Sequence, residues 1–524
     1  MILRWVVVVA ALGLGLLACA PREVPIRLEL VTRLCDGTSA LDGVTHLQFR
    51  ITGEGIDPPV EFVALSSSRE LQLPQVPAGL ARRIEVRGFD GAPTAAGRLV
   101  SRGVTSPFNV PAVMPLPGER VPDQTVFLRP VDRLAAPNLS VAPEACQHLA
   151  QPRAGHTASV LPDGRVLIAG GYRVEEASGV PVALAETELF DPRTGVFIAG
   201  PPLGVTNAAG GFTPTPRAFH AATALPDDRL LLTGGESYDS TGIATRHATA
   251  LVFDPARDPG RYGGFPLRVP RAHHATAADL QGRVLIVGGV DSADVLVPEL
   301  EWWGGDSAQT QLADQSLSRL GMSVAALPDG AVAVAGGQLA SGVTDLVQFF
   351  IYDEGARTFT SSRVPALLTQ ARRAAPVVPF ATPDQLLVLG GFGDTDEVQP
   401  APLGSSELLQ TTNPPVVLEG PAVTPRGSLC AVPLGDGRIL TVGGRGLDIN
   451  FSPVGSDAVE VMTPTSSGGS AVLGLQPLPV GRFQHSCTLL PDGTVLVLGG
   501  LSEDEDANTA VLGDAWVITP RPRD

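Results

Sequence analysis

The feature that most restricts the fold is a sequence unit that occurs seven times between residues 153 and 500. In each copy an Arg stands seventeen residues before the first residue of a Gly-Gly pair. The pairs are 48 to 64 residues apart, so the length varies only after Gly-Gly. We therefore expect one rigid supersecondary unit per copy, followed by a variable loop, as in solenoids and propellers. The arginines are Arg153, Arg217, Arg271, Arg319, Arg373, Arg426 and Arg482, and the pairs are Gly170-Gly171, Gly234-Gly235, Gly288-Gly289, Gly336-Gly337, Gly390-Gly391, Gly443-Gly444 and Gly499-Gly500.

The constant part of each copy is predicted to be a β-hairpin. In residues 156–171, HTASVL and RVLIAGG are strands and Pro-Asp-Gly is the turn, because Asp-Gly supplies the positive φ that a tight turn needs. The second strand is apolar at consecutive positions, for example VLIA, VLIV and VLVL. A strand that is apolar on both sides is covered on both faces, so we expect neighbouring sheets to pack face to face around an axis. A third strand, such as ETELFDP at 186–192, follows each variable loop.

This order of hairpin, Gly-Gly, spacer and a third strand ending in Asp-Pro resembles the kelch repeat. The resemblance covers residues 153–521 and implies a seven-bladed β-propeller with four strands in each blade. The family's usual fourth-strand Trp is mostly absent, since the repeats contain only Trp302, Trp303 and Trp516. The last unit has three expected strands, so we expect residues 134–145 to donate the fourth strand and close the ring.

A second all-β domain is expected before the repeats. Between residues 24 and 133, short runs alternate apolar and polar residues between turn clusters, as in THLQFRITGEG at 45–55. Strands at this spacing predict a small sandwich, which resembles the immunoglobulin-like or transthyretin-like modules of secreted bacterial proteins. The expected organisation is a signal peptide at 1–18, the sandwich at 19–133, a linker at 134–152 and the propeller at 153–524.

The first residues predict export and a lipid anchor. Arg4 precedes an apolar run from Trp5 to Ala18, which has the length of a secretory h-region and is too short to span a bilayer. The end of this run, Leu-Leu-Ala-Cys19, resembles the lipobox of bacterial lipoproteins, which implies cleavage before Cys19 and acylation of its thiol and amino group. An ordinary signal peptide with an incidental Cys is the alternative. Because Ala20 and not Asp follows, the resemblance favours the outer membrane, so we expect a lipid-anchored protein of the cell envelope.

The net charge bears on the class of ligand, and the remaining cysteines bear on the disulfides to be expected. A chain with net charge −17 lacks the basic footprint that nucleic acid requires. Four cysteines other than Cys19 allow three pairings in an exported protein. We expect a disulfide between Cys35 and Cys146, because both lie outside the repeats, and buried free thiols at Cys430 and Cys487.

The repeated Arg-x-x-His motif is interpreted as structural. Its histidines are His156, His220, His274 and His485, while Met322, Pro376 and Leu429 stand at the same position in the other copies. A residue that recurs in four copies and is apolar in three is more simply a scaffold residue than a ring of metal ligands. The loops after Gly-Gly are acidic and could bind calcium or a basic partner, although a solvated face is the simpler interpretation. We assign no catalytic residue, no metal site and no cofactor.

The predicted function is binding of a protein or glycan partner through the loops or the axial funnel. The alternative is a sugar-active enzyme of the epimerase, mutarotase or oxidase kind. Copper-radical oxidases that resemble galactose oxidase need two tyrosines, two histidines and a Cys–Tyr crosslink, and no matching motif is found among the four tyrosines. An enzyme should bring together His, Asp, Glu and Arg from unlike repeat positions in the funnel. A binding module should show polar and aromatic loop residues without such a cluster.

Overall fold

The computed structural model describes residues 6–7, 26–67, 76–94, 96–111, 121–206, 211–257, 261–305, 308–396, 399–464 and 470–523. Apart from one 3₁₀ turn at Gln315–Leu317, the regular elements in these ranges are β-strands. No helix among them is long and apolar enough to cross a membrane. Cys19 and nearly all of the predicted signal peptide lie outside the described residues.

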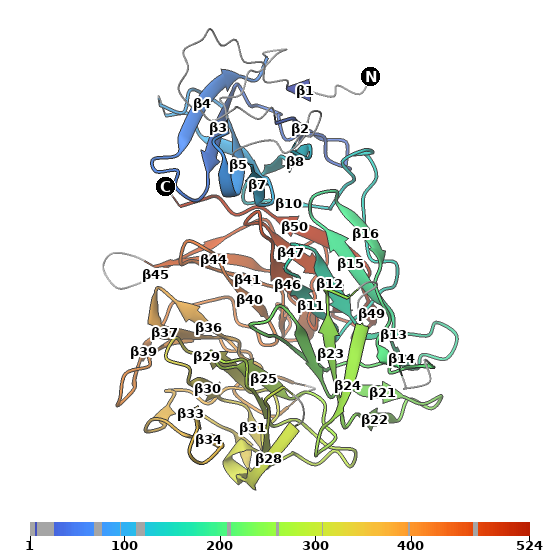
Figure 1. Ribbon diagram of the computed structural model, residues 1–524. Coiled ribbons are helices and arrows are strands. Elements are labelled where there is room, and N and C mark those ends of the chain that lie inside the picture. Colours follow the sequence, from blue (N-terminus) through green and yellow to red (C-terminus); the bar gives the residue numbers. More distant parts are fainter. Residues whose placement is uncertain are drawn as a thin grey trace.

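The N-terminal strands form a sandwich that lies against one side of the propeller (Figure 1). Its larger sheet has the order β4–β3–β5–β6–β9, with β7 also paired to β5, and its smaller sheet has the order β1–β2–β8, in which β2 and β8 are parallel. The strands are β1 (Val6–Val7), β2 (Leu28–Val31), β3 (His46–Thr52), β4 (Val60–Leu65), β5 (Gly79–Phe89), β6 (Leu99–Val104), β7 (Phe108–Val110), β8 (Gln124–Phe127) and β9 (Arg129–Pro130).

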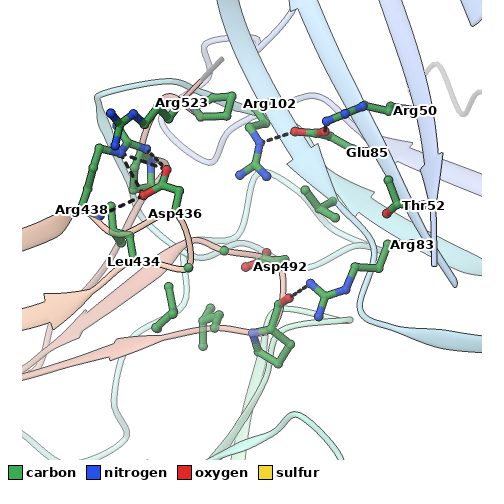
Figure 2. A pocket seen from close by; sticks show the side chains of 18 of the residues that line it. Arg50, Thr52, Arg83, Glu85, Arg102, Leu434, Asp436, Arg438, Asp492 and Arg523 are labelled. Carbon is green, nitrogen blue, oxygen red and sulfur yellow. Dashed lines mark hydrogen bonds and ion pairs between the residues drawn. The ribbon is translucent and has the colours of Figure 1, made fainter. Parts of the chain in front are cut away.

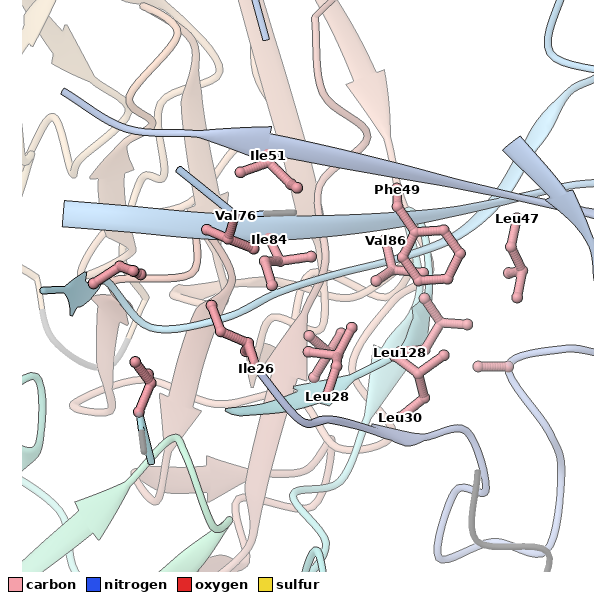
Figure 3. Close-up of a cluster of buried hydrophobic side chains, with 14 of the residues drawn as sticks. Ile26, Leu28, Leu30, Leu47, Phe49, Ile51, Val76, Ile84, Val86 and Leu128 are labelled. Atoms are coloured by element: carbon pink, nitrogen blue, oxygen red, sulfur yellow. The ribbon is translucent and has the colours of Figure 1, made fainter. Parts of the chain in front are cut away.

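The alternating pattern of the sandwich strands is explained by the core between the two sheets. Leu47, Phe49 and Ile51 occupy every second position of β3 and are buried. They face buried residues of the other strands, including Leu28 of β2 and Val86 of β5, as Figure 3 shows. Burying a side chain of this size stabilises the fold by roughly 1.5–3 kcal/mol, so the alternation sets which face of the sheet turns inward.

The repeats form seven sheets, each of which has four main strands, so the predicted fold class is confirmed. The innermost strands of neighbouring sheets contact one another all around the ring. Written from the axis outward, the blades are β11 (Thr157–Val160), β12 (Val166–Ala169), β15 (Thr187–Asp191) and β16 (Val196–Ala199); β19 (Ala221–Ala224), β20 (Leu230–Thr233), β23 (Thr249–Asp254) and β24 (Arg261–Pro266); β25 (Ala275–Ala278), β26 (Val284–Val287), β27 (Glu299–Trp303) and β28 (Ala308–Ala313); β29 (Ser323–Ala326), β30 (Val332–Ala335), β33 (Leu346–Asp353) and β34 (Thr358–Ser361); β36 (Val377–Phe380), β37 (Thr382–Leu389), β38 (Ser406–Gln410) and β39 (Val416–Glu419); β40 (Cys430–Pro433), β41 (Ile439–Val442), β44 (Val459–Pro464) and β45 (Ser470–Gly474); and β46 (Ser486–Leu489), β47 (Val495–Leu498), β50 (Ala515–Ile518) and β10 (Leu134–Ala135).

Short additional strands lie outside the four main strands of the blades. Three of them lie outside the loops that follow Gly-Gly: β35 pairs with β33, and β17 pairs with β18 between the first two blades. The others form hairpins in five of the loops that follow Gly-Gly. They are β13 (Tyr172–Val174), β14 (Pro181–Ala183), β17 (Gly204–Thr206), β18 (Phe212–Pro214), β21 (Glu236–Tyr238), β22 (Ala244–Arg246), β31 (Gln338–Leu339), β32 (Gly342–Val343), β35 (Ala366–Leu367), β42 (Arg445–Leu447), β43 (Pro453–Gly455), β48 (Leu501–Glu503) and β49 (Thr509–Val511).

The ring closes between the first and last repeats. Residues 134–135 form β10, which pairs with β50 as the outermost strand of the seventh blade. The inner strand of this blade, β46, contacts β11 of the first blade. The closure therefore joins the segment before the first repeat to the last repeat, so that no blade is left with three strands.

The fifth repeat corrects the uniform spacing that the sequence suggested. The arginine that binds Gly390 and Glu407 is Arg372 and not Arg373, so the offset to Gly390 is eighteen residues in this copy. The additional residue lies in the β36–β37 turn, where the register shifts after Pro379 and Ala381 has a φ of 56°. With the register counted from Arg372, the position that holds His in other copies is Ala375 and not Pro376.

Two disulfides join parts of the chain that are distant in sequence. Cys35 is bonded to Cys146, 111 residues away, and ties the sandwich to the segment that enters the propeller. Cys430 is bonded to Cys487, 57 residues away, with a Cα–Cα distance of 6.1 Å. The expectation of free thiols at Cys430 and Cys487 was therefore wrong, because β40 and β46 are the innermost strands of adjacent blades and bring the two thiols together.

Candidate functional site

The repeated arginines are fully buried and bind groups of their own blade. In the third blade, Arg271 donates from Nη1 to the carbonyl oxygen of Gly288 at 3.1 Å and from Nη2 to a carboxylate oxygen of Glu301 at 2.7 Å. Both side chains of this ion pair are 0 % exposed. A buried guanidinium is tolerated only when it is paired and hydrogen-bonded, so this arginine holds the first, second and third strands together. Four other blades place an acid on the arginine in the same way: Glu188, Glu407, Glu460 and Asp514.

The Gly-Gly pairs connect each blade to the next one. The backbone N–H of Gly171 donates to the carbonyl oxygen of Arg217 at 2.9 Å, and the same bond recurs from blade to blade until Gly500 donates to Arg153. A Cβ atom at Gly170 would overlap the carbonyl oxygen of Arg217. Glycine is therefore required here by the close approach of two blades, and the pair is not a phosphate-binding loop.

The motif histidines lie at the seams between blades. The Nε2 atom of His220 is 2.9 Å from Oγ1 of Thr157 in the preceding blade, and Nε2 of His156 is 2.8 Å from Oγ of Ser486 across the ring closure. Burial, reinforced by the charge of Arg217, lowers the pKa of His220 to about 3. Burial also lowers the pKa of His485 to about 3. These imidazoles are neutral packing groups at physiological pH.

The neutral histidines predict an acid-sensitive fold. Because the pKa of His220 is about 3 in the folded protein and about 6.5 in an unfolded chain, the unfolded state binds more protons between these values. The free energy of unfolding should fall as the pH drops below 6.5, by about 2 kcal/mol between pH 7 and pH 5 for each such histidine. Urea unfolding at several pH values measures this slope, which should be shallower in His220→Gln. The matched control is His148→Gln, an exposed position in the linker, and equal slopes in the two variants would contradict the assignment.

A ring of residues with positive φ surrounds one end of the propeller axis. The residue two positions after each buried arginine has a positive φ between 51° and 64°. Backbone bonds link neighbours around this ring, for example from the N–H of Phe219 to the carbonyl oxygen of Gly155 at 2.9 Å and from that of His273 to Phe219 at 3.1 Å. A residue other than Gly rarely adopts this conformation, and such strain is concentrated at functional sites. The ring consists of Gly155, Phe219, His273, Gly321, Ala374, Ser428 and Gln484.

Aromatic side chains from three repeats gather on this ring. The rings of Phe219 and His273 are stacked with centroids 4.2 Å apart. Tyr172, the first residue after the first Gly-Gly pair, packs against Phe219 at 5.5 Å and against Tyr238 at 6.2 Å. We call these four residues, together with Glu236 and Gln484, the axial cluster.

Polar groups of the axial cluster are hydrogen-bonded to one another. The hydroxyl of Tyr238 donates to Oε1 of Glu236 at 2.7 Å, and the hydroxyl of Tyr172 donates to Oε1 of Gln484 at 3.0 Å. The other carboxylate oxygen of Glu236 is 3.1 Å from Nε of Arg246 and 3.7 Å from Nε2 of His273. The Glu236 side chain is 5 % exposed and that of His273 is 34 % exposed. The imidazole is thus accessible to a ligand while the carboxylate lies behind it.

The electrostatics of the axial cluster keep the carboxylate charged and the phenols neutral. Burial would raise the pKa of Glu236, but His273, Tyr238 and Arg246 together lower it below its usual value. Burial and the charge of Glu236 raise the pKa of Tyr172 to about 12. The pKa of Tyr238 is raised further, by burial and by its hydrogen bond to Glu236. At neutral pH the cluster therefore contains two protonated phenols, an imidazole and a fixed negative charge.

Sequence reasoning missed the axial cluster except for Glu236, which belongs to the acidic loops it singled out. The available signal was the residue immediately before the motif histidine, which reads Gly, Phe, His, Gly, Ala, Ser and Gln through the seven copies when the fifth is counted from Arg372. Variation at one position of an otherwise regular repeat marks the side chains that meet at the axis. Within the described residues, no group of three or more His, Cys, Asp or Glu is placed to hold a metal ion.

Comparisons with known proteins bear on the fold. No family model matches the chain and no curated protein matches it. A solved fungal alcohol oxidase of the AA5 family, in complex with copper, is similar in structure with a TM-score of 0.52 and 16 % identity over 71 % of this chain and 76 % of that one. The structure of YjhT aligns with a TM-score of 0.44 and 12 % identity over 62 % of this chain and 99 % of that one. The chain is therefore similar in fold to the β-propeller of the fungal oxidase, and the likeness concerns the fold alone.

Proposed function

We propose that the axial cluster binds a reducing sugar and catalyses proton transfer at its anomeric centre, as a mutarotase or epimerase does. The observation that carries this proposal is the convergence of unlike residues from the first, second, third and seventh repeats on one end of the axis. An enzyme needs such a set, whereas a repeated scaffold does not produce it. Binding without catalysis is the second candidate, and the experiment below separates the two.

The arrangement suits a sugar ring in two respects. The rings of Tyr172 and Phe219 provide an apolar surface on which the C–H face of a sugar can stack. The side chains of Gln484 and His273 lie beside that surface and present hydrogen-bonding groups for hydroxyls. A few polar groups around an aromatic surface are typical of small-molecule sites.

The proposed step uses His273 as the base and Tyr172 as the acid. The imidazole takes the proton of the anomeric hydroxyl, the C1–O1 bond becomes a carbonyl, and the C1–O5 bond breaks. The ring oxygen takes the proton of the Tyr172 hydroxyl, which stays protonated at neutral pH because its pKa is about 12. Rotation about C1–C2 and the reverse transfers give the other anomer. Glu236 acts as a positioning residue, since its charge stabilises the imidazolium that forms.

A copper-radical oxidation does not fit these residues. Two tyrosines of the axial cluster lie near a single histidine of that cluster, and the motif histidines are buried at the blade seams. All four described cysteines are in disulfides, so none of them can form a crosslink to a tyrosine. Placement in the cell envelope through an acylated Cys19 remains a proposal from the sequence of residues 1–19.

The test is anomer exchange by NMR over a panel of reducing sugars. We expect His273→Gln to lower kcat about 100-fold with little change in KM, as is usual for loss of a general base. Glu236→Gln should lower kcat less and shift the pH profile. The control His148→Gln, in the exposed linker, should behave as wild type. Sugar binding without anomer exchange would establish the second candidate, binding without catalysis. If neither binding nor exchange is observed, both candidate functions are contradicted.

A further inference from the structure

The sandwich and the propeller enclose a cavity at the other end of the inner strands. The two domains are joined at this interface by Arg521, whose Nε is 3.0 Å from a carboxylate oxygen of Asp132 and whose Nη1 donates to the carbonyl oxygen of Leu99 at 3.0 Å. The backbone N–H of Asp132 donates to Thr519 at 2.8 Å. Beside these contacts is a cavity of about 660 Å³, shown in Figure 2.

One wall of the cavity comes from the sandwich and the other from the propeller. Strands β3, β5 and β6 supply the sandwich wall. The turns β40–β41 and β46–β47 and the C-terminal segment supply the propeller wall, which includes the apolar side chains of Leu434, Leu489 and Leu490. The cavity therefore has a charged side and an apolar side.

The charge of the lining is opposite to that of the protein. Six arginines and three carboxylates, those of Glu85, Asp436 and Asp492, line the cavity, which leaves three positive charges in excess. The chain as a whole has a net charge of −17. A local excess of arginine on an acidic protein is the signature of a site that attracts an anion. The arginines are Arg50, Arg83, Arg87, Arg102, Arg438 and Arg523.

The carboxylate inside the sandwich wall is shared among arginines. Glu85 lies 2.6 Å from Nε of Arg102, 3.1 Å from Nε of Arg87 and 3.9 Å from Nη1 of Arg50. Burial would raise the pKa of Glu85, but Arg102 and Arg87 hold it below its usual value. Arg50 is also 3.0 Å from Glu61, which lies outside the lining, so Glu61 and Glu85 together offset part of the positive charge of this wall.

Two of these guanidinium groups are directed at the cavity. Arg102 uses Nε for Glu85, and Figure 2 shows its terminal nitrogens pointing into the space above Asp492. Arg83 reaches across the cavity and donates from Nη1 to the carbonyl oxygen of Pro491. Arginine binds carboxylate and phosphate oxygens in a forked geometry, and here the fork of Arg102 lies beside Asp492 and Gly493.

We propose that this interdomain cavity binds a small organic anion, with its oxyanion head between Arg83 and Arg102 and its apolar body against Leu434, Leu489 and Leu490. The volume lies within the range of small-molecule sites, about 300–1,000 Å³. Because both domains line it, a bound anion also bridges the sandwich and the propeller. The site is separate from the axial cluster and does not rest on the proposed function.

Calorimetric titration of the full protein with three probes tests the proposal. Octanoate has an anionic head and an apolar body, inorganic phosphate has the head alone, and 1-octanol has the body alone. We expect octanoate to bind at least tenfold more tightly than either of the others, and its affinity to fall with added salt. No binding of octanoate, or equal binding of phosphate and octanoate, would overturn the proposal.

Substitutions locate the binding. Arg102→Gln and Arg83→Gln should each weaken octanoate about tenfold or more, as expected for loss of a charge-assisted hydrogen bond. Arg98→Gln is the matched control, because Arg98 belongs to the same domain, is 76 % exposed and lies outside the cavity. Thermal melts show which of the variants are folded. If Arg102→Gln unfolds because Glu85 loses its partner, the comparison is made between Arg83→Gln and the control. Equal affinity in the folded cavity variant and the control would place octanoate elsewhere and overturn the proposal.

Discussion

Replacing Arg372 with Met is expected to lower the free energy of unfolding by about 3–5 kcal/mol, and replacing the adjacent Arg373 by about 1 kcal/mol. The Arg372 side chain is 0 % exposed and its Nη2 lies 2.6 Å from a carboxylate oxygen of Glu407, which is 3 % exposed. Removing the guanidinium leaves a carboxylate buried without its counter-ion, which is the costly way to break such a pair. Arg373 instead donates to the carbonyl oxygen of Asp394, a loop residue, and lies over the ring of Phe392.

The measurement is urea unfolding followed by tryptophan fluorescence. Three of the four tryptophans lie in the propeller repeats, so the signal reports the domain that carries both substitutions. The two variants change the same residue type at neighbouring positions, and each is therefore the control for the other. If Arg373→Met lowered the free energy of unfolding more than Arg372→Met does, Arg373 would be the equivalent of the other repeat arginines. That result would restore the uniform seventeen-residue spacing and contradict the register of the fifth blade.

Removing the disulfide between Cys430 and Cys487 by a double Ser substitution should cost up to about 4 kcal/mol. The bond closes a loop of 57 residues, and the chain-entropy model gives a stabilisation of this order for such a loop. It also joins the innermost strands of the sixth and seventh blades, next to the closure of the ring. The propeller should therefore melt at a lower temperature, while the sandwich core is unaffected.

The matched control is the double Ser variant at Cys35 and Cys146. That bond closes a longer loop, 111 residues, and ties the sandwich to the segment entering the propeller. Its removal should release the sandwich without lowering the stability of the blade seams. Mass spectrometry first confirms the Cys430–Cys487 bond in the parent protein. An unchanged melting temperature of the propeller in the Cys430/Cys487 variant would then contradict a stabilising role of this disulfide.

The seven blades could be predicted from the sequence because each blade is specified locally. The Pro-Asp-Gly turn and its two apolar strands lie within seventeen residues, and the second strand is buried at every position in blades such as β12, β26 and β47. A pattern that depends on neighbours in sequence remains visible when it repeats. The register of the fifth copy was misassigned because Arg372 and Arg373 are adjacent and both buried, and only their hydrogen-bond partners distinguish them.

The two disulfides also separate what a local sequence pattern indicates from what only the tertiary structure shows. Their position outside the repeats favoured pairing Cys35 with Cys146, and Cys430 and Cys487 were expected to be separate thiols. Cys430 and Cys487 occur at the start of the first strand of consecutive blades, and nothing in either strand alone indicates that the two thiols meet. Their pairing follows from the lateral contact of β40 with β46.

By itself, the sequence determined the number of blades, the hairpin in each and the positions that must be Gly, because these depend on turn geometry and on hydrophobic patterns within one repeat. The tertiary structure alone decided which side chains meet. Phe219, Glu236 and His273 belong to different repeats or to different parts of one repeat, and they become neighbours because the ring stacks successive blades around an axis. The interdomain cavity likewise joins four arginines of residues 50–102 to Arg438 and Arg523, more than 300 residues later, because the sandwich docks on the turns of the last two blades. Convergence of this kind is a property of closure and docking, which no local pattern encodes.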